Sequence, residues 1–96
     1  MDRLDKVINR LKTFRDERNW QQYHTPENLS KSIVLEASEL LENFQYSELN
    51  KEDVHNVKEE LADIFAYGLL LMEHYDFDFE AMMYEKITKN AKKYPK

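Results

Sequence analysis

Residues 57–72 read VKEELADIFAYGLLLM, and this stretch decides the fold. Its second half, from Ile64 to Met72, is apolar on every side of a helix, which is typical of a helix surrounded by other helices. The apolar run is about half as long as a membrane span requires, so we expect no transmembrane segment. Such a helix needs helical neighbours, and the remaining sequence supplies them.

Two helices are expected before this stretch. The first covers about 2–18, where apolar residues recur at the three-and-four spacing of one helix face. The second begins at Pro26, which suits the first helical position, after Thr25 as its N-cap. It is expected to run to about Gln45.

The central helix and one further helix complete the set. Asn50 and Asp53 have the spacing of a capping box, which predicts a helix over about 51–74. Asp78 is a suitable N-cap for a last helix over about 78–92. The sequence therefore predicts an all-α, four-helix bundle-like fold.

Composition agrees with one helical domain over residues 1–96. The chain is 42% hydrophobic, 12% aromatic and 34% charged, with one Gly and two Pro, which favours helices over many short strands. We expect these helices to form a single compact unit. The absence of cysteine excludes disulfides and thiolate chemistry.

The charge of the chain restricts its partners. A net charge of −5 disfavours binding to a nucleic-acid polymer, which relies on basic surfaces. Residues 1–6 lack the apolar stretch of a signal peptide. We therefore expect a soluble, cytoplasmic protein with no membrane partner.

Four acids interrupt the apolar stripes of two expected helices. Glu36 lies on the stripe of the second helix with Glu39 one turn beyond it, and Glu60 and Asp63 repeat this arrangement on the third. One such pair alone is more typical of a solvated helix face. Two pairs on apolar faces would repel one another and raise their pKa values unless a cation joined them. Ligands that are all oxygen favour Mg²⁺, Mn²⁺ or Ca²⁺ over zinc.

The acid spacing belongs to a longer pattern. Glu36-x-x-Glu39, then 20 residues, then Glu60-x-x-Asp63 resembles the signature of the all-α nucleotide pyrophosphohydrolases, the MazG-like superfamily. Further stretches resemble its dCTP pyrophosphatase branch: 14–20 (FRDERNW), 23–24 (YH), 44–46 (FQY), 59–64 (EELADI), Lys86, Asn90 and 93–95 (KYP).

The resemblance implies a Mg²⁺-dependent enzyme that hydrolyses (deoxy)nucleoside triphosphates to the monophosphate and pyrophosphate, with Mn²⁺ as a substitute metal. It implies that the four acids hold the metal and carry catalysis, and that one of them could act as a general base. It also implies a set of substrate contacts, on the base or on the phosphates and sugar: Trp20, His24, Tyr46, Tyr67, Lys86, Asn90, Lys93 and Tyr94.

Several alternatives remain open. Trp20 is as well suited to anchor the packing of the connector as to stack on a base, and His24 could be a turn residue. Tyr46 stands where the mammalian branch has Trp, which leaves the nucleotide undecided, although a cytosine-type deoxynucleotide is preferred. A non-catalytic helical module that binds a divalent cation or a basic partner is the second functional hypothesis.

The third helix also favours an oligomer. A single small bundle surrounds an all-round apolar helix only partly, so neighbouring chains are expected to complete its burial. We therefore expect a homodimer or a homotetramer, as the resemblance also implies.

Overall fold

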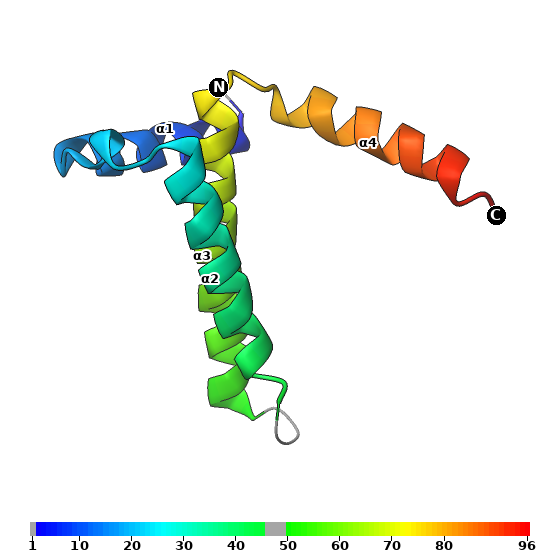
Figure 1. The fold of residues 1–96 in the computed structure, drawn as a ribbon, viewed down its shortest axis with the longest axis horizontal. Helices are drawn as coiled ribbons and strands as arrows, with labels where there is room; N and C mark the ends of the chain where they lie inside the picture. Colours follow the sequence, from blue (N-terminus) through cyan, green and yellow to red (C-terminus); the bar gives the residue numbers. More distant parts are fainter. Residues whose placement is uncertain (1, 46–49) are drawn as a thin grey trace.

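The computed structural model describes residues 2–45 and 50–96, and these form four α-helices, one short 3₁₀ turn and no strand. The elements in chain order are α1 (Arg3–Glu17), η1 (Trp20–Gln22), α2 (Pro26–Glu42), α3 (Lys51–His74) and α4 (Phe79–Lys93). Figure 1 shows their arrangement. The expected all-α fold class is confirmed.

Local capping contacts explain where the helices begin. The Thr25 hydroxyl accepts a hydrogen bond from the N–H of Asn28 at 3.1 Å at the start of α2. Asn50 and Asp53 form a reciprocal capping box, with N···O distances of 2.9 and 3.1 Å. Asp78 caps the first turn of α4. Each cap of this kind contributes about 1 kcal/mol.

Two local features differ from the expected elements. The expected second helix ends at Glu42 instead of near Gln45, because the side-chain amide of Asn43 donates to the carbonyl of Leu40 at 3.2 Å and closes the last turn. The connector after α1 contains the turn η1. Asn19 directly precedes this turn and has a left-handed backbone conformation, with a φ of 55°. Asn tolerates this conformation better than most residues.

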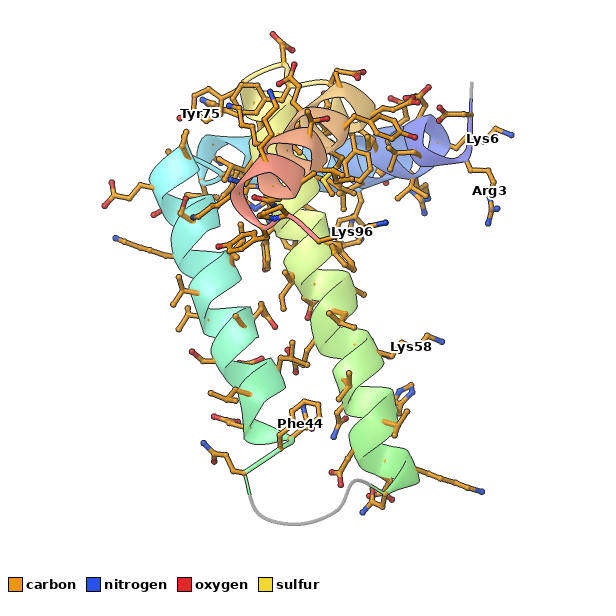
Figure 2. The ribbon with its side chains drawn as sticks, turned by 90° about the vertical axis from the view of Figure 1, so that its right-hand side faces the viewer. Arg3, Lys6, Phe44, Lys58, Tyr75 and Lys96 are labelled. Carbon is orange, nitrogen blue, oxygen red and sulfur yellow. The ribbon has the colours of Figure 1, made fainter. Side chains whose placement is uncertain are left out.

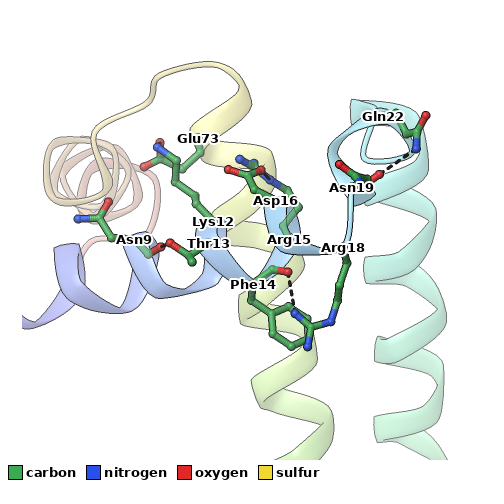
Figure 3. Close-up of polar contacts among 10 residues, drawn as sticks. All are labelled: Asn9, Lys12, Thr13, Phe14, Arg15, Asp16, Arg18, Asn19, Gln22 and Glu73. Carbon is green, nitrogen blue, oxygen red and sulfur yellow. Dashed lines mark hydrogen bonds and ion pairs between the residues drawn. The ribbon is translucent and has the colours of Figure 1, made fainter.

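The main packing unit is the antiparallel pair of α2 and α3, which lie side by side in Figures 1 and 2. α1 crosses the end of this pair where α2 begins and α3 finishes. There the ammonium group of Lys12 lies 3.6 Å from a Glu73 carboxylate oxygen, which ties α1 to α3 (Figure 3). The buried apolar side chains of the described residues come from these three helices: Ile8, Leu29, Leu70 and Met72.

α4 stands apart from the other helices. In Figure 1 it projects away from the α2–α3 pair, and it has no extensive contact with another described element. The radius of gyration is 15.9 Å, whereas a compact chain of this length has about 12 Å. The four expected helices are present, but the expectation that one chain packs them into a compact unit is wrong.

The α2–α3 pair has one exposed apolar face. At 100° per residue, Val34 and Leu41 lie roughly 150° around α2 from Glu36, and Phe65 lies about 140° around α3 from Glu60. On both helices these apolar residues are rotated away from the acids in the same sense. Because the helices are antiparallel and Glu36 and Glu60 face each other, the apolar residues of α2 and α3 lie on the same side of the pair. This apolar face consists of exposed residues only: Val34, Leu41, Phe44, Val54, Leu61 and Phe65.

The third helix is therefore less buried than its composition suggests. Phe65 is 63% exposed, because α2 and α1 are the only described elements that pack extensively against α3. No helix in the described part of the chain has the length and apolarity to cross a membrane.

Candidate active site

Three acids meet where α2 packs on α3. Glu36, Glu60 and Asp63 each offer one carboxylate oxygen, and these three oxygens lie within 4.8 Å of one another. Glu36 and Glu60 are half-buried, and the Oε2 atom of each is buried with no hydrogen-bond partner among the described residues. The sequence pattern on two helices thus becomes one acid cluster, formed by Glu36, Glu60 and Asp63.

The carboxylates of the acid cluster perturb one another. Contact with the Glu60 carboxyl raises the pKa of Glu36 to about 7, with burial and the charges of Asp63 and Glu39 adding to the effect. Glu39 is outside the cluster of three oxygens, but the Glu60 carboxyl also raises the pKa of Glu39. At neutral pH and without a cation, the Glu36 carboxyl is therefore partly protonated, and a bound cation would replace this proton.

The donor set fits a hard divalent cation. A buried carboxylate oxygen without a donor costs free energy, and a cation between the three carboxylates would satisfy both unpartnered oxygens at once. All the donors are oxygen atoms, as Mg²⁺, Mn²⁺ and Ca²⁺ prefer. Glu36, Glu60 and Asp63 would hold the ion, with Glu39 adjacent.

A cavity of about 400 Å³ adjoins the acid cluster between α1 and α3. Asp63 lines it together with Trp20, His24 and Tyr67, so four of the expected site residues share one cavity. The ring centroids of Trp20 and His24 are 6.2 Å apart, and those of His24 and Tyr67 are 6.4 Å apart. Phe14 meets Trp20 edge to face at 5.6 Å. The cavity therefore has aromatic walls and one acidic end.

Two groups in this cavity are held in their neutral forms. Burial lowers the pKa of His24, and the positive charge of Arg15 lowers it further. Its Nδ1 atom is buried without a hydrogen-bond partner among the described residues. Burial raises the pKa of Tyr67, and the carboxylates of Glu36 and Asp63 add to this. The cavity thus offers an uncharged imidazole and a protonated phenol.

The expected phosphate and sugar contacts lie elsewhere. Lys86, Asn90 and Lys93 are on α4, and Tyr94 follows it, with the Lys93 ammonium 5.3 Å from the centre of the Tyr94 ring. Because α4 projects away from α2 and α3, the chain does not bring these side chains to the acid cluster. Tyr46 lies outside the described residues.

Phe14 and Arg15 also line the cavity, and the sequence reasoning did not select either as a site residue. A signal for Arg15 was present. It follows Leu11 by four residues and Ile8 by seven, so it lies on the apolar stripe of α1 as Glu36 does on α2. A charged residue on an apolar stripe is a candidate for a partly buried side chain with a functional role.

Residues 31–96 contain both acid pairs and the whole of α4, and they match the MazG-like family. The chain belongs to the MazG-like family. This match confirms the resemblance drawn from the acid spacing.

Similar proteins include mammalian enzymes of this type. The chain is 30% identical to dCTP pyrophosphatase 1 of Rattus norvegicus and of Homo sapiens, and 31% identical to that of Bos taurus. Each match covers 85% of this chain and 53% of the relative, so the chain spans about half the length of these curated relatives.

The fold also resembles a solved structure, a pyrophosphatase from Archaeoglobus fulgidus DSM 4304. The TM-score is 0.87 and the sequence identity 36%, over 100% of this chain and 95% of that one. The all-helical architecture is thus the fold of a known pyrophosphatase.

Proposed function

We propose that this MazG-like protein hydrolyses (deoxy)nucleoside triphosphates to the monophosphate and pyrophosphate with the help of Mg²⁺. The observation that carries the proposal is the acid cluster at one end of an aromatic cavity. The similarity to dCTP pyrophosphatases and to a solved pyrophosphatase supports it. Removal of unwanted nucleotides from the pool is the corresponding cellular role.

Glu36, Glu60 and Asp63 hold the cation, and Glu39 lies beside them. When bound, Mg²⁺ supplies charge neutralisation and alignment for the phosphate chain. The acid that remains free of the metal is the candidate to accept a proton from the attacking water.

The base occupies the aromatic cavity in this proposal. Asp63 belongs to both the cavity and the acid cluster, so the phosphates extend toward the acids while the base lies between the aromatic walls. Trp20 offers a stacking surface, and stacking contributes about 1–3 kcal/mol per base. Neutral His24 and the Tyr67 phenol supply polar contacts. A cytosine-type deoxynucleotide is the preferred substrate, as in the names of the relatives.

The active unit is a homodimer or homotetramer. The apolar face of the α2–α3 pair is suited to bury itself against a second copy, and closed symmetry is the usual arrangement. The α4 side chains Lys86, Asn90 and Lys93 then act on the phosphates of a partner's site, since they do not reach the acids of their own chain. The negative acid cluster and the positive end of α4 are complementary in charge.

A nucleotide panel tests the function. The protein is incubated with canonical and modified deoxynucleoside triphosphates and Mg²⁺, and monophosphate and pyrophosphate are measured. We expect both products, most efficiently from dCTP, and none in excess EDTA. Binding of Ca²⁺ with no hydrolysis of any nucleotide would instead support the non-catalytic cation-binding module.

A further inference from the structure

Arg15 is a charged residue enclosed at the wall of the aromatic cavity. Only 19% of its side chain is exposed, which is unusual for arginine. It lines the cavity of about 400 Å³ with Trp20 and His24, and it also lines a second, polar cavity of about 270 Å³. It therefore lies at the boundary between the two cavities.

One side of the guanidinium is fixed and the other is free. The Arg15 Nε donates to Oδ1 of Asp16 at 2.8 Å (Figure 3), and this bond lowers the pKa of Asp16. The Asp16 carboxylate thus stays ionised and holds the guanidinium in place. The two terminal amino groups of Arg15 have no hydrogen-bond acceptor among the described residues. They are available to a ligand.

The two cavities show which part of a nucleotide Arg15 can reach. The second cavity shares Arg15, His24 and Leu70 with the first, and no member of the acid cluster lines it. Arg15 therefore borders the part of the aromatic cavity that adjoins the second cavity, whose lining contains none of the three acids. In the proposed function the phosphates extend toward the acids, so Arg15 is placed for the base.

The chemistry of the free groups selects a type of base edge. A guanidinium has donors and no acceptor, and its two terminal amino groups match two neighbouring acceptors. Cytosine presents the acceptors O2 and N3 side by side, whereas N3 of uracil and thymine carries a hydrogen. We propose that Arg15 is a specificity-determining residue that donates to O2 and N3 of a cytosine base and disfavours uracil and thymine. This inference rests on the proposed function.

Steady-state kinetics of Arg15→Ala with dCTP, dUTP and dTTP test it. We expect kcat/KM for dCTP to fall at least about tenfold and kcat/KM for dUTP to change far less, because only the cytosine edge loses two bonds. The substrate 3-deaza-dCTP, which lacks the N3 acceptor, should be poor for the unaltered protein and insensitive to the substitution. Lys12→Ala, one turn away and lining only the second cavity, should keep the preference.

The outcomes separate this inference from the proposed function. An equal fall in kcat/KM for dCTP and dUTP in Arg15→Ala would show that Arg15 is a packing residue. An unchanged preference for dCTP over dUTP in this variant would also overturn the inference, and so would a preference of the unaltered protein for dGTP. Binding gives a readout without turnover, because Trp20 is the single tryptophan and lines the cavity. Titration with α,β-imido analogues of dCTP and dUTP should show the same loss of preference in Arg15→Ala. Binding with this preference but no hydrolysis would refute the proposed function and retain the role of Arg15.

Discussion

Glu36 and Glu60 each have a buried carboxylate oxygen that accepts no hydrogen bond within the described chain, and the two carboxyl groups contact each other. Such an arrangement destabilises the metal-free protein. A bound cation would compensate for this cost. Substitution of either residue should therefore change both metal binding and the stability of the metal-free protein.

Glu60→Gln should separate metal binding from folding. We expect turnover to fall roughly 100-fold or more, because a metal ligand is lost. The melting temperature of the metal-free protein should rise, because repulsion with Glu36 is relieved. Glu59→Gln is the matched control: Glu59 is exposed and lies 3.2 Å from His55 on another side of α3. A Glu60→Gln protein with full activity would contradict the assignment of the acid cluster.

The pKa of Glu36 predicts how stability varies with pH in EDTA. Glu36 titrates near 4.5 in the unfolded chain and at about 7 in the folded protein, so between these values the folded state binds more protons. The melting temperature should therefore fall as pH rises from about 4.5 to about 7 and then level off. His24 acts in the opposite direction. Because its pKa is lowered in the folded protein, the folded state binds fewer protons than the unfolded chain just below pH 6.5, and this contribution makes stability rise with pH. Comparison with Glu36→Gln isolates the Glu36 contribution, which the variant should lack.

Trp20→Ala tests the base site at the same scale. If Trp20 stacks on the base, KM should rise about tenfold or more, since 1.4 kcal/mol corresponds to a factor of ten. The Mg²⁺ concentration that gives half-maximal activity should change little. Tyr23→Ala serves as the control, because Tyr23 is 62% exposed and does not line the cavity. An unchanged KM for every nucleotide would show that Trp20 only packs against Phe14.

At the scale of the elements, the helix starts were predictable, and so were the ends of α1, α3 and α4, which lie within one residue of their expected positions. Thr25, Asn50 and Asp78 cap the helices where the sequence predicts them, because an N-cap depends on residues within one turn. The end of α2 was misplaced, because Asn43 bonds back to Leu40 and no sequence period shows this. The acids of two helices were recognisable because their spacing conflicts with the apolar stripe.

What could not be predicted depends on long-range packing. No local pattern indicates that η1 turns Trp20 toward His24 and Tyr67, or that Arg15 borders two cavities. The direction of α4 was also inaccessible, because an apolar stripe shows that a helix packs on something without showing on which chain. The expectation of a compact chain failed for that reason.

The cap of α2 gives a stability prediction. Thr25→Ala should lower the free energy of unfolding by about 1 kcal/mol, because the N–H of Asn28 loses its acceptor. Ser30→Ala is the control within the same helix. Its hydroxyl donates to the Pro26 carbonyl at 2.7 Å on an exposed turn, and its loss should change stability by less than about 0.5 kcal/mol. Urea unfolding of the two variants makes the comparison, and equal losses would contradict the capping account.

At the scale of the whole molecule, the apolar face of α2 and α3 predicts association. Light scattering at micromolar concentration should give at least twice the 11.7 kDa of one chain. Phe65→Glu should shift the protein toward the monomer, because it places a charge on an exposed residue that the proposed association would bury. Tyr23→Glu, at a residue of similar exposure outside that face, should not. A stable monomer of the unaltered protein would exclude the proposed assembly.

The projecting position of α4 has a consequence for reaction order. If Lys86 and Asn90 of one chain act on the nucleotide of another, the unit that turns over substrate exists only in the associated state. Specific activity should then fall on dilution below the dissociation constant of the pair, and in that range the rate should rise with the square of the protein concentration. A cell that makes little of this protein would possess disproportionately little of its activity, so the outlying helix would convert changes in expression into steeper changes in nucleotide hydrolysis.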